Sequence, residues 1–313
     1  MITFPSRKLW SSLAFPAKIV IYLTAWVSCH CVMKYGFGVY MAISTLESNS
    51  ELSALYRYWE LVSVLAGREI KVRYRGSLLG VYWSLFNPLI MTALYGAIFG
   101  AAFKKYYHDS IGEYSLAAFT GLAVIHFYNG CTSQSLPSIV NNGILLNKIK
   151  LPVSVFPVSI VIANTFQLSI GMLPILAIVT LMRSTDRLSS ILNIIAIIVI
   201  LLALVAISAG VSFLTSSLFV FFRDLPFLYE LVQFVLLMST PIFYPAAIVD
   251  PRIRPFLELN PLYPIIESLR QIILSGNPPD ILLILRAWLS GIVILGIGFG
   301  CFNLLRSKFM DLL

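Results

Sequence analysis

Residues 67–90 read GREIKVRYRGSLLGVYWSLFNPLI, and they change abruptly from a basic segment to an apolar one. The basic segment contains Arg68, Lys71, Arg73 and Arg75. After it, no charged residue occurs before Lys104. Lysine and arginine are typical of the cytoplasmic ends of membrane spans. We therefore predict that the chain enters the membrane near Leu79 and that the basic segment lies on the cytoplasmic face.

The composition of the whole chain is that of a membrane protein. Of 313 residues, 58% are apolar and only 12% are charged, whereas about 25% are charged in a soluble domain. Several apolar segments exceed the roughly 18 residues needed to cross a hydrocarbon core. Residues 153–182 and 189–222 lack the alternation of a β-barrel strand. We predict an all-α polytopic membrane protein, and the net charge of +8 then indicates topology and lipid anchoring rather than nucleic-acid binding.

Six spans are expected, which would put both ends of this core on the same side. Their approximate bounds are Leu79–Phe103, Tyr114–Leu136, Val153–Met182, Ser189–Leu218, Phe227–Val249 and Ile281–Leu305. Lysine and arginine are only slightly more numerous on one side than on the other. The density of Arg68–Arg75 therefore decides the orientation, with both core termini in the cytoplasm.

An amphipathic helix is predicted just before the first span, over residues 48–76. Apolar and aromatic side chains recur there at helical spacing, at Leu52, Leu55, Tyr56, Trp59, Val62, Leu65 and Ala66. We expect this helix to lie in the membrane interface with that stripe dipping into lipid.

Residues 1–50 form an N-terminal extension to the domain of residues 51–313. Its apolar part, residues 17–43, fits an extra span, a signal-like segment, or sequence upstream of a true start at Met33 or Met41. The triplet Cys29-His30-Cys31 offers too few ligands for a metal site.

Residues 241–279 are rich in proline and hold eight of the sixteen prolines. One continuous helix is excluded there, because proline interrupts helical hydrogen bonding. The apolar pieces, residues 246–249 and 261–274, are too short to span. We predict short re-entrant helices on the outer side, and the alternative is an extracellular loop with a surface helix.

Catalytic and nucleotide-binding motifs are missing from the sequence. It has no G-x-x-x-x-G-K-[ST] phosphate loop, H-E-x-x-H or G-x-S-x-G, so the chain is not expected to hydrolyse ATP itself. The first, third and fourth spans carry no charged residue away from their ends, which disfavours an ion-driven carrier.

Two loops on the predicted cytoplasmic side are candidates for contact with a partner. PSIVNNGILLNKIKLP, residues 137–152, carries Asn141, Asn142, Asn147, Lys148 and Lys150. FFRDLP, residues 221–226, carries Arg223 and Asp224. Short helices there can insert into a partner's cleft and transmit its movement, and the alternative is simple turns.

Aromatic residues are plentiful in the first and fifth spans. They are Tyr82, Trp83, Phe86 and Tyr95 in the first, and Phe234, Phe243 and Tyr244 in the fifth. Such residues serve packing or the interfacial belt, or their faces stack on sugar rings inside a channel.

In this order, these segments resemble the membrane subunits of type-2 ATP-binding-cassette exporters that move polysaccharides and teichoic acids. The resemblance covers about residues 51–310. REIKVRYRGSLLGVYWSLFNPLIM resembles the family's approach to the first span, and FVFFRDLPFLYELVQFVLLMSTPIFYPAAIV its inner loop and fifth span. Two departures concern the inner half: the usual tryptophan is missing near residues 125–126, and the usual arginine is missing at Val153.

The resemblance implies a homodimer paired with two ATPase subunits, which bind ATP and Mg²⁺, so no cofactor is expected in this chain. Ser138–Lys150 and Phe221–Leu225 would contact the ATPase. Residues 241–275 would form the outer gate, with Pro241, Pro245, Asn260, Pro261, Glu267 and Arg270.

The expected function is export of a lipid-linked glycan through the bacterial cytoplasmic membrane. The resemblance favours an O-antigen-type chain on undecaprenyl pyrophosphate, with teichoic acid or capsule as variants. Arg68, Lys71, Arg73 and Arg75 are candidates for the pyrophosphate, because guanidinium groups bind phosphate bidentately. From a different class, a membrane enzyme acting on lipid-linked glycans would need paired carboxylates, and only Glu258 and Glu267 lie close in sequence.

Overall fold

The computed structural model describes residues 50–148, 151–183 and 187–309, and every regular element among them is a helix. The expected all-α class is therefore confirmed for these residues. The chain divides into two units, residues 1–60 and 61–313. The first unit is described only from Ser50, where α3, Ser50–Arg73, begins. The rest of the predicted extension, with the Cys29-His30-Cys31 triplet, lies outside the described residues.

Six helices of 15 or more residues follow α3. They are α4 (Trp83–Phe103), α5 (Ile111–Ser135), α8 (Val155–Arg183), α9 (Arg187–Phe221), α10 (Leu225–Ser239) and α13 (Ile281–Leu305). Shorter helices connect them: α6 (Ser138–Asn141), α7 (Gly143–Lys148), α11 (Arg254–Glu258) and α12 (Tyr263–Arg270). A π-helical turn, Gln271–Ser275, extends α12.

Among the residues that the structure describes, four segments are long and apolar enough to cross a membrane. They are Gly80–Tyr106, Val155–Arg183, Ser189–Phe221 and Ile281–Lys308, and they match the first, third, fourth and last predicted spans. Helices α5 and α10 occupy the places of the second and fifth. The count of six spans therefore stays a prediction.

The fifth predicted span, about residues 227–249, is wrong in its extent. Helix α10 ends at Ser239 after 15 residues, a length of about 22 Å against a hydrocarbon core of about 30 Å. Thr240 leaves the helix with an extended backbone. Pro241 and Pro245 follow it, and proline cannot donate the backbone hydrogen bonds that would continue the helix.

Part of the apolar stripe of α3 faces protein rather than lipid. Val62, Leu65 and Ala66 were expected to dip into the bilayer, but all three are buried. Val64 and Val72, which lie off that stripe, are exposed. For the described part of the second unit, the expectation of a lipid-facing stripe is therefore wrong.

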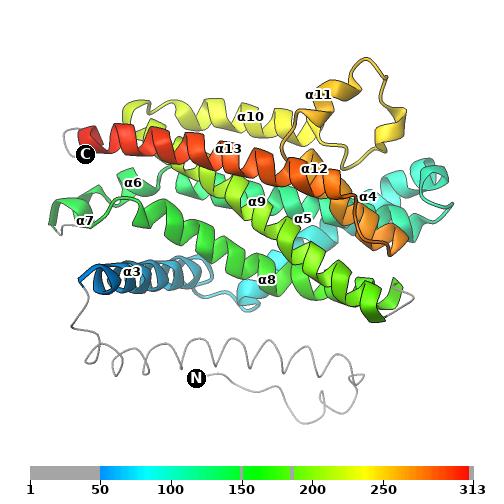
Figure 1. The fold of residues 1–313 in the computed structure, drawn as a ribbon, viewed down its shortest axis with the longest axis horizontal. Helices are drawn as coiled ribbons and strands as arrows, with labels where there is room; N and C mark the ends of the chain where they lie inside the picture. Colours follow the sequence, from blue (N-terminus) through cyan, green and yellow to red (C-terminus); the bar gives the residue numbers. More distant parts are fainter. Residues whose placement is uncertain (1–49, 149–150, 184–186, 310–313) are drawn as a thin grey trace, which may run out of the picture. The chain divides into compact units, whose positions relative to one another are not determined.

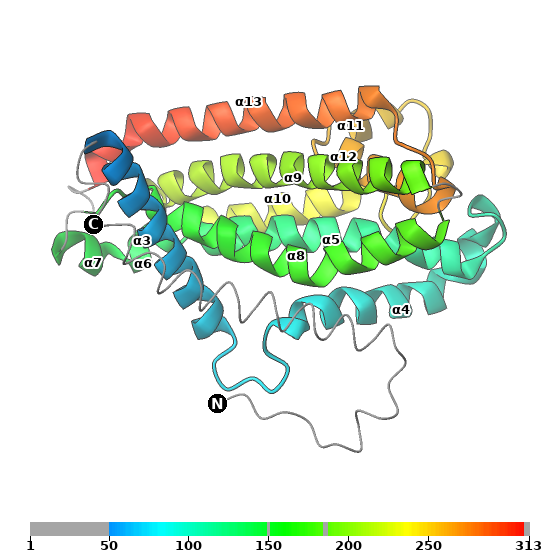
Figure 2. The same ribbon diagram turned by 60° about the horizontal axis from the view of Figure 1, so that its bottom comes forward.

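The long helices of the second unit lie side by side along roughly one direction (Figures 1 and 2). Helices α6 and α7, the turn between α9 and α10, and the end of α13 gather at one end of this bundle. Helices α11 and α12 lie toward the other end. The loops that the sequence assigned to one side of the membrane therefore share one end of the bundle.

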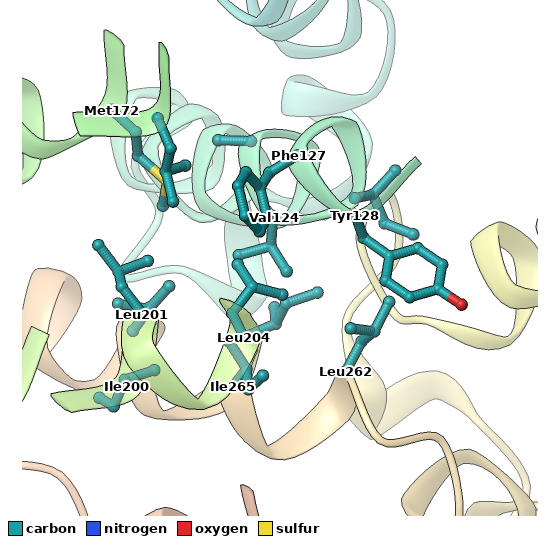
Figure 3. Packing of buried hydrophobic residues seen from close by; sticks show 14 of the residues in the cluster. Val124, Phe127, Tyr128, Met172, Ile200, Leu201, Leu204, Leu262 and Ile265 are labelled. Atoms are coloured by element: carbon teal, nitrogen blue, oxygen red, sulfur yellow. The ribbon is translucent and has the colours of Figure 1, made fainter. Parts of the chain in front are cut away.

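The core lies where α5, α8, α9 and α12 meet. Val124 and Phe127 of α5 pack with Leu204 of α9 and Ile265 of α12 in one buried cluster (Figure 3). Helix α5 is central to it and has many small buried residues, which allow its neighbours to approach closely.

The proline-rich segment of residues 241–279 is broken into short helices, as expected from its composition. Helix α12 is buried on most of its length, and its neighbours are α5, α9 and α13. Asn260 joins this segment to the end of α10, because its side-chain amide donates to Oγ1 of Thr240 at 2.7 Å. Its Oδ1 accepts the backbone N–H of Leu262 at 3.0 Å, which fixes the start of α12.

Candidate functional site

A cavity of about 300 Å³ lies between the end of α3, the start of α4, and helices α5 and α8. We call it the Arg73 pocket. Its walls include Arg73, Tyr74, Trp83, Asn87, Phe119, Ala123, His126, Asn129, Gln134, Asn164, Gln167, Leu168 and Met172. All of these residues belong to the second unit of the chain.

The turn between α3 and α4 brings the basic segment to this pocket. Gly76 and Gly80 have φ angles of 77° and 52°, a left-handed conformation that glycine adopts without steric cost. The hydroxyl of Ser77 accepts the backbone N–H of Gly80 at 3.1 Å. The chain therefore turns sharply after α3, and Arg73 and Trp83 line the same cavity.

Arg73 is held by side-chain amides of α5 and α8. Its Nη1 donates to Oδ1 of Asn164 at 3.1 Å and to Oε1 of Gln167 at 2.9 Å, and its Nη2 donates to Oε1 of Gln134. The amide of Asn164 also donates to Oε1 of Gln134, at 3.2 Å. The hydroxyl of Tyr74 donates to Oε1 of Gln167, at 3.2 Å. One cation thus organises three amides from two helices.

The pocket has a net positive charge among its described lining residues, because Arg73 is there and no aspartate or glutamate is. Neutral amide oxygens orient their dipoles toward the guanidinium but do not cancel its charge. Gln167 is only 7% exposed. Its Nε2 finds no acceptor among the residues that the structure describes, and a buried donor of this kind is costly to leave unpaired.

The pocket changes from polar to apolar along its length. On α5, Gln134 and Asn129 lie toward the end with Arg73, and Ala123 and Phe119 lie deeper. Gln134 and Phe119 are about 22 Å apart along the helix axis. The lining residues of α8 follow the same order, from the amides to Leu168 and Met172. The cavity is therefore shaped for a polar head and an apolar tail.

A second polar cluster lies where α5 begins and α8 ends. Glu113 accepts a hydrogen bond from Nη1 of Arg183 at 2.9 Å, and its other oxygen lies 2.6 Å from Nδ1 of His108. Nη1 of Arg183 also donates to the carbonyl of Leu274 at 3.1 Å. Burial acts to raise the pKa of Glu113, but these hydrogen bonds and charges outweigh it and hold the pKa below its ordinary value.

The chain matches the ABC-2 type transporter family over residues 60–274, which is more than half of its length. The chain belongs to the ABC-2 type transporter family. Its membership confirms the resemblance that the motifs indicated. Together with four helices long enough to span a bilayer, it makes this chain an integral membrane protein.

The ABC-2 chain is also similar over most of its length to three named permeases. Two from Klebsiella pneumoniae, each named O-antigen export system permease protein RfbA, are 28% identical to it over 255 and 259 residues. These matches cover 82% of this chain and 95% of each relative. A protein of the same name from Myxococcus xanthus is 25% identical over 261 residues, which covers 82% of this chain and 96% of the relative.

Of the four cations predicted to meet the substrate headgroup, the structure brings only Arg73 to the ABC-2 chain's pocket. Arg68, Lys71 and Arg75 are exposed. Arg68 and Lys71 are three residues apart on α3 and share a face, whereas Arg73 is five residues after Arg68 and points to another side. Arg75 follows the end of α3 at Arg73.

The predicted channel aromatics separate into exposed and packed residues. Tyr82, Trp83, Phe86 and Phe234 are between 42% and 60% exposed. Tyr95 and Phe243 instead pack on each other, with ring centroids 4.2 Å apart. The hydroxyl of Tyr244 donates to the carbonyl of Met238 at 2.9 Å.

The predicted coupling residues lie mostly on the surface of one end of the bundle. Asn141, Lys148, Arg223 and Asp224 are exposed, and the amide of Asn142 donates to the carbonyl of Ser138 at 2.8 Å. Lys150 lies outside the described residues. Asn147 lies on α7. The guanidinium of Arg223 lies over the ring of Phe219 and forms no ion pair with a described carboxylate.

Residues predicted for the outer gate are largely buried. Pro241, Pro245, Asn260 and Arg270 are buried, and Pro261 and Glu267 are half-buried. Arg270 donates from Nε to the carbonyl of Ala117 and from Nη2 to that of Ile242, at 3.3 and 3.2 Å. Burial also raises the pKa of the neighbouring Tyr107 phenol.

Sequence reasoning missed the amides that hold Arg73. Gln134, Asn164 and Gln167 are uncharged, whereas the prediction rested on ionisable residues within the spans. A usable signal was present, because Asn164 and Gln167 are three residues apart and share one face of an apolar helix. Polar side chains within spans face the protein interior or a cavity.

Proposed function

We propose that this chain is the permease subunit of an ATP-driven exporter that moves a lipid-linked, O-antigen-type glycan across the bacterial cytoplasmic membrane. The observation that carries this proposal is the similarity, over at least 95% of each relative, to proteins named O-antigen export system permease. Such coverage means that nearly every part of those relatives has a counterpart here. In this proposal the glycan is carried on undecaprenyl pyrophosphate.

In the proposed assembly, two copies of the chain span the membrane and two copies of an ATPase subunit bind ATP and Mg²⁺. The sequence has no phosphate loop of its own, so the energy must come from such a partner. The domain of residues 51–313 crosses the membrane six times, with its termini in the cytoplasm. Helices α6 and α7 and the turn at Phe222–Asp224 receive the ATPase, since they share one end of the bundle (Figure 1).

The glycan path in this proposal runs along the exposed aromatics of α4 and α10. Trp83, Phe86 and Phe234 are exposed, and the apolar faces of sugars stack on aromatic rings. The basic segment at the end of α3 faces the lipid headgroups, where it meets the pyrophosphate. Residues 241–275 form the outer gate.

Co-expression with the ATPase that its genome supplies tests the assembly. We expect that ATPase to co-purify with the chain. Lys148→Glu combined with Arg223→Glu should weaken the association at least tenfold by reversing charge at the proposed contact. Lys104→Glu combined with Lys105→Glu is the matched control, because these exposed lysines lie between α4 and α5 at the opposite end. Equal retention of the ATPase by both double variants contradicts the proposed contact.

Export itself is measured by the amount of glycan at the cell surface. In cells that lack their own O-antigen permease, this chain, its ATPase and its glycan genes should restore surface glycan, and an ATPase unable to hydrolyse ATP should not. Teichoic acid or capsular polymer at the surface would instead identify that polymer as the substrate. Turnover of a lipid-linked glycan by the chain alone, without the ATPase, would favour a membrane enzyme and contradict the permease role.

A further inference from the structure

We propose that the Arg73 pocket binds one phosphate-bearing lipid, with the phosphate at Arg73 and the adjoining hydrocarbon between α4, α5 and α8. The inference rests on the proposed function, because it supplies a specific site for the headgroup of the exported lipid. It also assigns the binding of the headgroup to Arg73 and the surrounding amides, in place of all four cations of the basic segment.

Charge is the first argument for a phosphate. Arg73 is the cation among the described lining residues, and its printed contacts are all to neutral oxygens. They use Nη1 and Nη2, so Nε–H donates to no described residue. A guanidinium that keeps its charge and free N–H groups is suited to a phosphate oxygen.

The second argument is a buried, unpaired donor on a residue that lines the same pocket. Gln167 turns its oxygen toward Arg73 and Tyr74, so its NH₂ group must point elsewhere. That Nε2 is buried and unpaired among the described residues, and Gln167 lines the pocket. A phosphate oxygen beside Arg73 would accept from it, and a buried donor gains most from such a partner.

The third argument is that the other requirements of a lipid are met. Leu168, Met172 and Phe119 give the deeper part an apolar lining for the first carbons of a chain. Near the polar end, Oδ1 of Asn129 is buried without a donor among the described residues. A hydroxyl group of a sugar or of glycerol would donate to it. A free inorganic phosphate would use the polar end alone.

Two lipids share this chemistry, namely the polyprenyl diphosphate of the proposed substrate and an ordinary anionic phospholipid of the bilayer. The experiment distinguishes the two lipids by their dissociation constants. These are measured by native mass spectrometry on the purified full-length protein in detergent. The probes are undecaprenyl diphosphate, phosphatidylglycerol and undecaprenol, which has the same hydrocarbon without phosphate.

Gln167→Glu is the decisive variant. It keeps the size of the side chain and gives Arg73 a carboxylate partner, so the fold should be retained. It also replaces the free donor with an acceptor and cancels the charge of the pocket. We expect undecaprenyl diphosphate to bind at least tenfold more weakly to Gln167→Glu and to Arg73→Gln. Arg306→Gln is the control for general charge, since this exposed arginine lies just after α13, and its effect should stay within twofold.

Each outcome decides the inference. Unchanged binding by folded Gln167→Glu and Arg73→Gln, or equal binding of undecaprenol and the diphosphate, overturns it. If phosphatidylglycerol binds as tightly as undecaprenyl diphosphate, the pocket is a site for phospholipid and its link to the exported substrate is refuted. If lipid binding fails while ATPase co-purification and export persist, the exporter function stands without this site.

Discussion

At the scale of single residues, two arginines are stabilised by oxygens that carry no formal charge. Arg73 donates to side-chain amides, and Arg270 donates to the backbone carbonyls of Ala117 and Ile242. Neither forms an ion pair with a described carboxylate. Their environments differ, because Arg73 lines a cavity whereas Arg270 is 5% exposed. This contrast predicts binding for the first and structural support for the second.

Arg270→Leu should therefore destabilise the fold. The change removes two hydrogen bonds from a charged donor and leaves the carbonyl of Ile242 buried without that partner, at a cost of about 2–4 kcal/mol. Thermal unfolding of the purified protein in one detergent measures it. Arg286→Leu is the control, because Arg286 is exposed and its distance to Glu258 is 3.7 Å. Equal melting temperatures for the two variants would contradict a structural role for Arg270.

Glu113 makes a stability contribution that depends on pH. Its pKa is lower in the folded protein than the ordinary 4.5, so the ionised form is stabilised by folding. This stability is present above pH 4.5 and is lost as the pH falls through the lower folded value. Wild type should melt a few degrees above Glu113→Gln at pH 7, because an ion pair near the protein surface is worth about 1 kcal/mol or less.

Melting curves of wild type and Glu113→Gln between pH 7 and pH 3 provide the measurement. The difference in melting temperature should shrink as the pH falls below 4.5. A difference that stayed constant, or grew, over that range would show that the charge of Glu113 does not stabilise the fold.

At the scale of elements, the close crossing of α9 and α13 depends on two glycines. A Cβ at Gly298 would lie 2.0 Å from the backbone oxygen of Gly210, and one at Gly210 would lie 2.6 Å from the carbonyl of Ile294. Small residues let helices in a membrane approach this closely. The two glycines thereby favour one register between two long apolar helices.

Gly298→Ala should separate the two helices and destabilise the protein by about 3 kcal/mol or more, because backbone rather than a flexible side chain opposes the new methyl group. Gly300→Ala is the matched control on the same helix, since nothing lies within 4 Å of its Cβ position. The yield of monodisperse protein and its melting temperature are the measurements. Similar values for both variants would argue against the tight crossing.

At the scale of the whole molecule, α10 leaves an apolar face uncovered in a single copy of the chain. Phe227, Leu231, Phe234 and Val235 are each at least 60% exposed. A helix of about 22 Å is short for an isolated span, and contact with a second copy would shelter it. The proposed homodimer accounts for this face.

A cysteine at Leu231 tests the dimer. In a chain whose four native cysteines are replaced by serine, Leu231→Cys should form a disulfide-linked dimer on mild oxidation in membranes, if two copies of α10 meet there. Leu289→Cys on α13 is the control, because Leu289 has the same exposure of 66%. A non-reducing gel reads both. Cross-linking at Leu289 and not at Leu231 would place the dimer contact on α13 and contradict a contact through α10.

The sequence by itself determined the class of the protein, its family, and the places of its long helices. Helix α13 has the predicted bounds Ile281–Leu305, and α8 and α9 start within two residues of their predicted positions. These features depend on local signals: the length of an apolar run, proline, and charge at its ends. Such signals act on neighbouring residues, so they can be read without knowing what lies across the fold.

Only the tertiary structure decided which polar residues act together. Arg73 meets Asn164 and Gln167 across more than ninety residues of sequence, and the three cations beside it stay outside the pocket. Periodicity gives the face of a helix but not the neighbour that covers it, so the buried stripe of α3 was assigned to lipid. The number of prolines in a segment does not show where the last helical hydrogen bond is made. The predicted fifth span therefore ends ten residues after the end of α10. Packing between helices, rather than the preference of any one of them, selects these contacts.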